Sequence, residues 1–379
     1  MTNEAKSTQF TGKAINRAGE ALLDSKLLER EPQKFEQSMA ALSYWRAMHE
    51  KPLEEAYALL GACAEKIRVK VVLAKRLKRA PSIISKLQRF DGMKLRNMQD
   101  IGGCRAILPT HKKLLKLLRE FKRRKTVRVK DYIEEPKPDG YRGIHLIGDF
   151  SDKTENRRSI EIQLRTEIQH AWATGVEIVD LFTGQAIKSN RGKEEWKEFF
   201  RSLSVMFSLI EGLNLTKPKD MRHLVDSIVG KLFGPEKIHF VQSAERAYAL
   251  SSKLKVIENL EVFASTLKVT DEHLTMKPHD GYVLLSIHVK NKALSLLNFA
   301  KSEFDLAVSN YLDYEKMAAS DGQQAVVLLA AEAVGGIKEA YPNYFGDSSR
   351  FLTLLRASNA AYRQIEPNRL WRTIKRMWV

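Results

Sequence analysis

Four short groups of residues between Arg76 and Thr166 combine side chains suited to binding phosphate groups and a divalent metal ion. The first is Arg76-Leu-Lys78-Arg79-Ala-Pro-Ser82, with Lys86 four residues further along. Lys78 and Ser82 are also four residues apart, so a helical stretch would place all three side chains near one face. Two cations with a hydroxyl group between them suit a triphosphate.

Two further groups supply carboxylates. In Asp100-Ile-Gly-Gly-Cys-Arg105, an acid at the mouth of a strand is followed by glycines, which allows a metal ion to sit close to the backbone. In Glu161-Ile-Gln163-Leu-Arg165-Thr166, alternation places Glu161, Gln163 and Arg165 on one side of a strand. Asp100 and Glu161 could together hold Mg²⁺ and the phosphates of ATP, while Glu161 could also accept the proton of an attacking hydroxyl.

The fourth group, Pro136-Lys137-Pro-Asp-Gly140-Tyr141-Arg-Gly-Ile-His145, is a turn-rich loop with a cation, an aromatic ring and an imidazole. The Tyr141 ring could stack on the base of an acceptor nucleotide. Each group has a structural alternative when taken alone. An Asp beside glycines can simply form a turn, a loop Tyr can be packing, and Glu161 with Arg165 can be a surface pair. The functional interpretation depends on all four groups occurring in order.

The elements that must position these residues follow from periodicity. Residues 11–70 and the stretch up to Leu77 have apolar residues at helical spacing, and PSIISKLQRF predicts a short helix. GGCRAILP predicts a buried strand, HKKLLKLLREFKRR an amphipathic helix, and TVRVKDYIEEPKPDGYRGIHLIGDF a strand, a loop and a strand. RSIEIQLRT then predicts a strand and EIQHAWATGVEIVDLF a helix. We therefore expect an α/β (α+β) fold with a mixed β-sheet flanked by helices.

The second half of the chain predicts a smaller α/β domain. The polar segment NLTKPKDM is the candidate linker, so the expected domains are 1–215 and 216–379. After it we expect helices, strands at VFASTLKV and YVLLSIHV, a long helix over roughly 292–317, a strand at QAVVLLAAE, and further helices. Trp371 and Trp378 are expected to pack in a terminal helix.

Composition excludes several classes of protein. The chain of 379 residues has no run of 18 apolar residues, so we expect no membrane span. The polar start MTNEAKSTQF predicts no secretory signal. Cys63 and Cys104 fit neither a disulfide framework nor zinc-ligand spacing, and are expected to be core residues. A cytoplasmic protein without a membrane partner is the resulting expectation.

The charge is strongly positive and unevenly distributed. The net charge is +17, and the segment 66–130 alone contains 22 Lys and Arg against three acidic residues. Such a field attracts polyphosphates or nucleic acid. The structural alternative is a solvated basic surface.

As an ordered set, these groups resemble the synthetase domain of the RelA/SpoT proteins, which make ppGpp and pppGpp. The resemblance covers roughly residues 60–210. DYIEEPKPDGYRGIH resembles the acceptor-binding G-loop, and IEIQLRTEIQHAW resembles the strand and helix that carry the catalytic glutamate. The resemblance implies a pyrophosphokinase that transfers the β,γ-pyrophosphate of ATP to a ribose 3′-hydroxyl with Mg²⁺.

Individual roles follow from the same resemblance. It implies that Arg76 and Arg105 sandwich the adenine, that Lys78, Ser82 and Lys86 hold the ATP phosphates, and that Asp100 and Glu161 are the catalytic, Mg²⁺-binding acids. It implies that the acceptor site is lined by Lys137, Tyr141, His145, Gln163 and His170. Two positions depart from the family pattern: Gly143 stands where Ser is usual, and His170 where Asn is frequent. Both lie on the acceptor side, which puts a guanosine acceptor in doubt; His170 could instead be a core histidine.

The length beyond residue 215 resembles the toxic small alarmone synthetases and the fused toxin–antitoxin CapRel type. That resemblance implies a C-terminal antitoxin-like domain that inhibits the enzyme and senses a phage protein. Tyr341-Pro-Asn-Tyr344 resembles the regulatory YxxY element of that type, although two tyrosines at this spacing occur often by chance. Related toxins place pyrophosphate on the 3′-CCA end of tRNA and stop translation, and a broad basic surface suits a tRNA acceptor.

Three hypotheses for function therefore remain open. The first is an autoinhibited toxin that pyrophosphorylates tRNA in antiviral defence. The second is a stringent-response enzyme with the same chemistry that uses GDP or GTP as acceptor. The third is a non-catalytic protein that senses nucleotide or RNA, against which the intact pair Asp100 and Glu161 argues.

Overall fold

The computed structural model describes residues 10–24, 26–78, 80–151, 157–183, 187, 192–215, 220–261, 281–288, 293–303, 306, 307, 309–311, 313, 314, 324–330 and 342–365. The chain forms two compact units. The first comprises Met1–Glu135 and Gly143–Glu167, and the second comprises Pro136–Arg142 and Ile168–Val379. These divisions differ from the predicted ranges 1–215 and 216–379, which stay a prediction of domain organisation. Residues 216–219, half of the predicted linker, lie outside the described residues.

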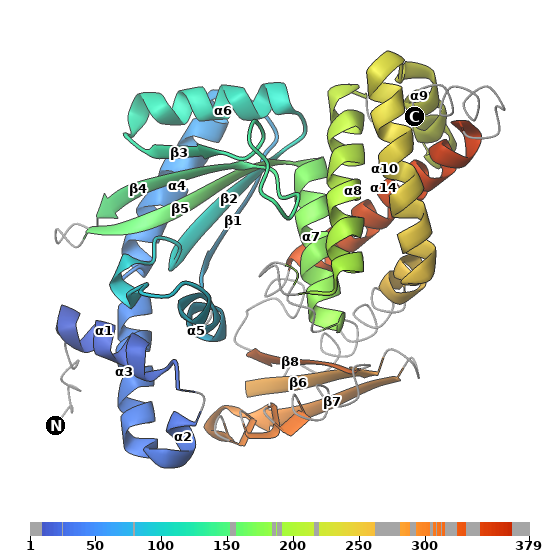
Figure 1. Ribbon diagram of the computed structural model, residues 1–379. Helices are drawn as coiled ribbons and strands as arrows, with labels where there is room; N and C mark the ends of the chain where they lie inside the picture. Colours follow the sequence, from blue (N-terminus) through green and yellow to red (C-terminus); the bar gives the residue numbers. More distant parts are fainter. Residues whose placement is uncertain are drawn as a thin grey trace. The chain divides into compact units, whose positions relative to one another are not determined.

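The first unit is a five-stranded mixed sheet with helices. Four helices come first: α1 (Gly12–Ala21), α2 (Leu27–Arg30), α3 (Pro32–Ala47) and α4 (Glu50–Lys66). They are followed by β1 (Val72–Leu77), α5 (Ala80–Arg89), the 3₁₀ turn η1 (Leu95–Asn97), β2 (Gly102–Leu108), α6 (His111–Arg124), β3 (Arg128–Asp131), β4 (Ile144–Ser151) and β5 (Arg157–Thr166). The strand order is β1-β2-β5-β4-β3 (Figure 1), with β2 and β5 parallel and the other pairs antiparallel.

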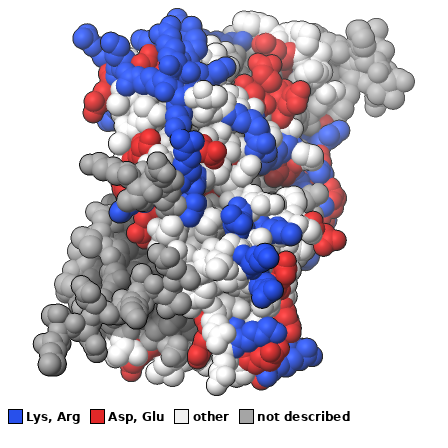
Figure 2. Space-filling view, turned by 90° about the vertical axis from the view of Figure 1, so that its left-hand side faces the viewer, with Lys and Arg blue, Asp and Glu red and all other residues white. Residues whose placement is uncertain are grey.

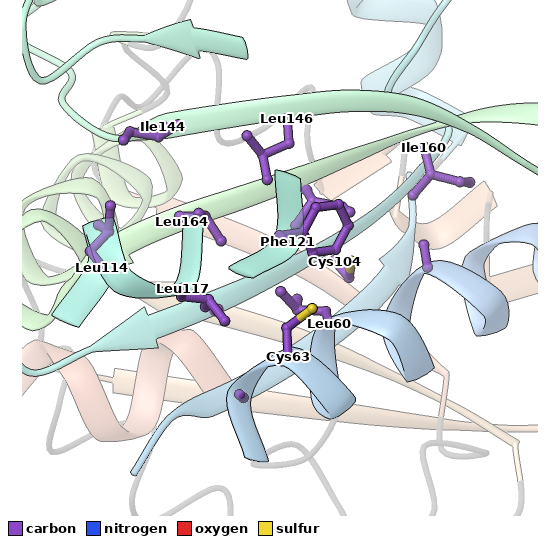
Figure 3. Packing of buried hydrophobic residues seen from close by; sticks show 14 of the residues in the cluster. Leu60, Cys63, Cys104, Leu114, Leu117, Phe121, Ile144, Leu146, Ile160 and Leu164 are labelled. Atoms are coloured by element: carbon purple, nitrogen blue, oxygen red, sulfur yellow. The ribbon is translucent and has the colours of Figure 1, made fainter. Parts of the chain in front are cut away.

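One face of this sheet is apolar because alternate residues of its strands point toward α4 and α6. Leu60 and Cys63 of α4 and Leu117 and Phe121 of α6 are fully buried there. Figure 3 shows them packed with side chains of the central strands, which include Cys104, Leu146 and Leu164. Both cysteines are buried and free, as expected, and burial raises the pKa of the Cys104 thiol to about 12. The opposite face of the sheet is therefore left for polar side chains.

A second cluster joins the N-terminal helices to α5. Trp45 of α3 and Ile83 and Leu87 of α5 are among its buried members. At the junction of α3 and α4, His49 is 1% exposed, and its Nδ1 donates to the carbonyl oxygen of Trp45 at 2.8 Å. Burial, opposed by that hydrogen bond and assisted by the charge of Arg158, lowers the pKa of His49 to about 4.

Replacing His49 with Gln is expected to make stability less sensitive to acid. Because the pKa is about 4 in the folded state and about 6.5 when unfolded, protonation favours the unfolded chain. Stability is thus retained above pH 6.5 and falls by about 3 kcal/mol as the pH drops toward 4. Urea unfolding at several pH values should give a flatter profile for His49→Gln; an unchanged slope would contradict the burial of a neutral imidazole.

The second unit contains helices and a small sheet. Its helices include α7 (Glu167–Thr183), α8 (Glu194–Gly212), α9 (Met221–Lys231), α10 (Gly234–Lys253) and α14 (Pro342–Ile365). The strands β6 (Gly281–His288), β7 (Ala293–Ala300) and β8 (Gln324–Ala330) form an antiparallel sheet of order β7-β6-β8, and η3 (Lys301–Glu303) follows β7. No helix in the described part of the chain is both long enough and apolar enough to cross a membrane.

The C-terminal helix α14 packs against α7 and α8 within this unit through Phe351. The Phe351 ring is fully buried and lies 6.1 Å from the ring of Phe200 and 6.0 Å from that of Phe207. A Cβ added at Gly175 of α7 would lie 2.5 Å from the Phe351 ring. Gly175 therefore forms the notch that admits this ring.

The predicted α+β class is confirmed, but two strands were missed. Residues 72–77 were expected to continue a helix, yet α4 ends at Lys66 and β1 pairs with β2. The long helix expected over 292–317 is wrong at its start, because 293–300 form β7, paired with β6. Both segments carry apolar residues at spacings that fit a helix or a strand. They form strands because each pairs with a neighbouring strand. The strand expected at 262–269 lies outside the described residues, as do Trp371 and Trp378.

Candidate active site

The polar face of the first unit's sheet carries residues predicted for both the ATP site and the acceptor site. Arg105 of β2 pairs with Gln163 of β5, which pairs with His145 of β4. Directly paired residues of neighbouring strands share a face, so these three side chains form one row. Glu161 lies in the next row, opposite Gly103. The absence of a side chain at Gly103 leaves space beside the Glu161 carboxylate.

Asp100 forms the first part of the site together with two lysines. Its carboxylate accepts hydrogen bonds from Lys78 Nζ and Lys86 Nζ, both at 2.8 Å. The backbone N–H of Lys78 donates to the carbonyl of Ile101 at 2.7 Å, which extends the β1–β2 pairing and brings Lys78 beside Asp100. Burial would raise the pKa of Asp100, but the charges and hydrogen bonds of Lys78 and Lys86 outweigh it and hold that pKa below its usual value.

Glu161 forms the second part of the site. Its Oε1 accepts from Gln163 Nε2 at 2.7 Å, and its Oε2 lies 3.2 Å from His145 Nδ1. Burial would raise the pKa of Glu161, but the hydrogen bonds from His145 and Gln163 and the nearby charges of His145 and Lys86 lower it well below its usual range. Lys86 thus interacts with both carboxylates, which places Asp100 and Glu161 in one electrostatic site.

Arg76 and Arg105 lie on the same face of the sheet, and their predicted adenine-binding role stays a prediction. Arg76 of β1 pairs with Gly103, two residues before Arg105, so the two arginines are diagonal neighbours on the polar face. Diagonal neighbours are about 7–8 Å apart. A planar ring in contact with a side chain on each side needs about 7 Å, twice the contact distance of about 3.5 Å. The strand positions of Arg76 and Arg105 are therefore compatible with a base between their side chains.

Ser82 and Lys86 lie on α5, one turn apart, as the spacing predicted. Lys78 lies before the helix begins at Ala80, so the expectation that one helix face carries all three is wrong. Lys78 reaches the site from the end of β1 instead. The Ser82 side chain is exposed.

The loop residues Lys137 and Tyr141 belong to the second unit. Tyr141 is only 9% exposed, which favours the structural alternative of a loop tyrosine that packs. Its ring is 6.4 Å from the ring of Trp172, and Lys137 Nζ lies 4.8 Å from its centroid. The turn is held by Ser204 Oγ, which donates to the carbonyl of Gly140, a residue with φ +92°. A base that stacks on Tyr141 must therefore displace Lys137 or Trp172.

Tyr141→Ala is consequently expected to affect stability as well as activity. Removing a buried aromatic ring should lower the free energy of unfolding by about 2 kcal/mol, and it should abolish pyrophosphate transfer if the ring binds the acceptor. Tyr141→Phe keeps the ring and serves as the control. Denaturant unfolding together with a transfer assay measures both effects, and wild-type stability of the Ala variant would contradict the burial.

His170 and the regulatory tyrosines complete the predicted set. His170, in α7, is 2% exposed, a burial that favours the structural alternative of a core histidine over contact with an acceptor. Tyr341 lies outside the described residues. Tyr344 falls within α14, but its side chain is likewise outside what the structure describes. The roles of all three stay predictions.

Some residues of the site were not singled out from sequence. Tyr132 packs edge-on against the His145 ring at 5.1 Å. In the second unit, a small pocket beside Gly140 is lined by Gln169, Trp172 and Glu211, among others. Gln169 Nε2 donates to Glu211 at 2.9 Å. Glu211 is far from the motifs in sequence, so no local pattern could have indicated it.

The residues present fit Mg²⁺ as it is usually bound beside nucleotides. Among the described residues, no group of three or more His, Cys, Asp or Glu could hold a metal ion by itself. Magnesium at phosphate-transfer sites is commonly held by one or two carboxylates, with substrate phosphates and water as the remaining ligands. Asp100, which Lys86 contacts, and Glu161, whose pKa the charge of Lys86 helps to lower, would supply that pair.

The fold and the site together define an α+β domain with two carboxylates among lysine and arginine side chains. Residues 75–180 match the family model of the region found in RelA/SpoT proteins. GTP pyrophosphokinase YwaC of Bacillus subtilis is 34% identical over 111 residues, 26% of this chain and 52% of the relative. The probable GTP diphosphokinase CRSH, chloroplastic, of Arabidopsis thaliana is 33% identical over 109 residues, 25% of this chain and 18% of the relative.

The chain spans about half or less of the length of these curated relatives. Among solved structures, the small alarmone synthetase 1 from Bacillus subtilis bound to its product pppGpp is similar. It is 22% identical with a TM-score of 0.39, over 45% of this chain and 93% of that chain. The family match thus covers the segment that holds Lys78, Asp100 and Glu161.

Proposed function

We propose that this chain is an ATP-dependent pyrophosphokinase. The observation that carries the proposal is that Lys86 donates a hydrogen bond to Asp100 and its charge also acts on Glu161, beside a sheet face that presents Arg76 and Arg105. The match of residues 75–180 to the RelA/SpoT region and the names of the two relatives support it.

In the proposed reaction, the 3′-hydroxyl oxygen of a ribose attacks the β-phosphorus of ATP. The bond between that phosphorus and the oxygen bridging to the α-phosphate breaks, and AMP leaves. Arg76 and Arg105 hold the adenine, while Lys78, Ser82 and Lys86 bind the phosphates and offset their charge. Asp100 and Glu161 would hold Mg²⁺, which supplies further charge neutralisation.

The proton of the attacking hydroxyl is assigned to Glu161. Hydrogen bonds from Gln163 and His145 keep this carboxylate ionised and oriented, as a proton acceptor must be. On this proposal, the ion pairs of Asp100 with Lys78 and Lys86 are exchanged for phosphate contacts when ATP binds.

For the acceptor, we propose the 3′-CCA end of tRNA, so that transfer blocks translation. The supporting observation is the outer face of α6, where Lys112, Lys116, Arg119 and Lys122 are exposed and only Glu120 is acidic within the helix. Lys and Arg gather densely in the upper part of the face seen in Figure 2. GDP or GTP is the second candidate acceptor, which the names of both curated relatives favour.

One assay separates these acceptors and the non-catalytic alternative. The full chain is incubated with Mg²⁺ and γ-labelled ATP, together with deacylated tRNA or with GDP and GTP, and Glu161→Gln is the inactive control. Label on tRNA supports the first candidate. Label found only in guanosine products refutes tRNA as the acceptor but supports the pyrophosphokinase activity. Transfer to neither acceptor, by the wild type and by a Tyr341→Ala, Tyr344→Ala double variant alike, refutes the enzyme and favours a protein that senses nucleotide or RNA.

We further propose that residues 216–379 inhibit the enzyme as an antitoxin-like domain, which a phage protein relieves in antiviral defence. The packing of Phe351 of α14 against α7 supports a C-terminal influence on the helix that follows the strand of Glu161. Cells expressing a Tyr341→Ala, Tyr344→Ala double variant should grow more slowly than cells with the wild type, and adding Glu161→Gln should restore growth. Equal growth of the double variant and the wild type would contradict this role of the two tyrosines.

A further inference from the structure

Three polar side chains on one face of β5 are joined head to tail by hydrogen bonds. Arg165 Nη2 donates to Gln163 Oε1 at 2.7 Å, and Gln163 Nε2 donates to Glu161 Oε1 at 2.7 Å. The chain of contacts continues to β4, where His145 Nδ1 lies 3.2 Å from Glu161 Oε2. Residues two apart in a strand lie about 6.5–7 Å apart on one face, a distance that these long side chains bridge.

The direction of these hydrogen bonds is determined by Arg165. A guanidinium group can only donate, so the atom of Gln163 that faces it must be the carbonyl oxygen. The amide nitrogen of Gln163 is then obliged to face Glu161. Without Arg165, rotation of the amide by half a turn would point its oxygen at the Glu161 carboxylate, where two acceptors repel each other.

Arg165 is well placed to impose this order. It is 7% exposed, near the end of β5, where its backbone pairs with Ile107 of the parallel strand β2. A buried guanidinium loses few rotamers on making such a contact, because its fork of donors is planar and rigid. The Gln163 amide is thus held by Arg165, and the Glu161 carboxylate by Gln163 on one oxygen and by His145 on the other.

We propose that Arg165 is a positioning residue for Glu161, acting through the amide of Gln163. The proposal rests on the proposed function, since it assigns Glu161 the reacting role. A carboxylate that is free to move away from its reactive position reacts more slowly. Misplacement of a reacting group by about 1 Å lowers the rate about 100-fold. The loss therefore falls on kcat and leaves the KM for ATP nearly unchanged, because Arg76, Lys78 and Lys86 still bind the nucleotide.

The test compares Arg165→Met, which keeps an unbranched apolar stem but removes the donors, with Arg165→Lys, which keeps a donor. In the full chain, Arg165→Met should lower kcat by about 10–100-fold with little change in the KM for ATP, and Arg165→Lys should lose less. Arg157→Met is the matched control: Arg157 is exposed on the same strand and face, and should retain wild-type kinetics.

A double variant decides whether Arg165 acts through Gln163. In a Gln163→Met background, Arg165→Met should lower kcat no further, because there is no amide left to orient. Three outcomes would each overturn the proposal. Arg165→Met could lower kcat equally in both backgrounds, it could have wild-type kinetics, or it could raise the KM for ATP without lowering kcat.

A readout that does not need activity keeps this test separate from the proposed function. The shifts in melting temperature caused by Arg165→Met and Gln163→Met should be non-additive in the double variant, as expected for residues in direct contact. If the wild-type protein transfers no pyrophosphate but the shifts of the variants are non-additive, the proposed function is refuted and the hydrogen-bonded contact chain is supported. Additive shifts would refute the contact chain whether or not the enzyme is active.

Discussion

Glu161→Gln is expected to reduce pyrophosphate transfer by at least about 100-fold, the scale on which charged groups at a reaction centre act. The amide has nearly the same shape as the carboxylate, and its oxygen can still accept from Gln163. It cannot carry the negative charge that Glu161 holds between His145 and Lys86. Initial rates with saturating ATP measure the loss.

The fold should survive this substitution, because the replaced side chain keeps its size. A melting temperature close to that of the wild type is the companion result, and Glu54→Gln, an exposed acid on α4, should change neither rate nor melting temperature. Wild-type transfer by Glu161→Gln would remove Glu161 from the reaction. Asp100→Asn then tests the other carboxylate independently, with a stability loss expected because Lys78 and Lys86 would face each other without their shared partner.

Phe351→Ala is expected to lower the free energy of unfolding by about 3–5 kcal/mol, the range observed when a large buried ring is removed. The ring is fully buried among Phe200, Phe207 and Gly175. Its loss leaves a cavity between α14 and α7, which the helices can close only in part. Urea unfolding of the full chain measures the change, and a loss under about 1 kcal/mol would contradict this packing.

Gly175→Ala tests the same contact from the other side. Alanine in a helix is about 1 kcal/mol more favourable than glycine, so the substitution should stabilise the protein unless the new methyl group meets the Phe351 ring. We expect a net loss of stability, and recovery of the alanine benefit in a Phe351→Ala background. Gly230→Ala in α9 is the matched control, because nothing lies within 4 Å of its added Cβ, and it should be neutral or stabilising.

The elements that the sequence predicted well are those whose pattern has a single interpretation. HKKLLKLLREFKRR became α6 and RSIEIQLRT became β5, because the first fits only a helical period and the second alternates. β1 escaped prediction because its residues, VLAKRL, follow α4 with little interruption and do not alternate between apolar and polar side chains. This segment is a strand because it pairs with β2. Local periodicity does not predict such pairing between residues distant in sequence.

The candidate site divides in the same way. The residue types at Asp100, Arg105 and Glu161 could be selected from short motifs. Their interactions could not: Lys78 and Asp100 are brought together by a strand pairing, and Lys86 approaches from a helix that precedes Asp100. The burial of Tyr141 depends on Trp172, which lies beyond the intervening strands β4 and β5 in sequence. Loop composition alone predicts an exposed ring, and only tertiary packing changes that.

The two lysines on Asp100 affect how ATP binding should be measured. A lysine that is already paired with a protein carboxylate attracts few anions from the salt. Few anions are therefore released when a phosphate group replaces the carboxylate. Under the proposed function, affinity for ATP would then report the difference between two sets of ion pairs, one internal and one with the nucleotide. The affinity should fall less steeply with salt concentration than a count of the surrounding Lys and Arg suggests, since Lys78 and Lys86 bring their own counter-ion in Asp100.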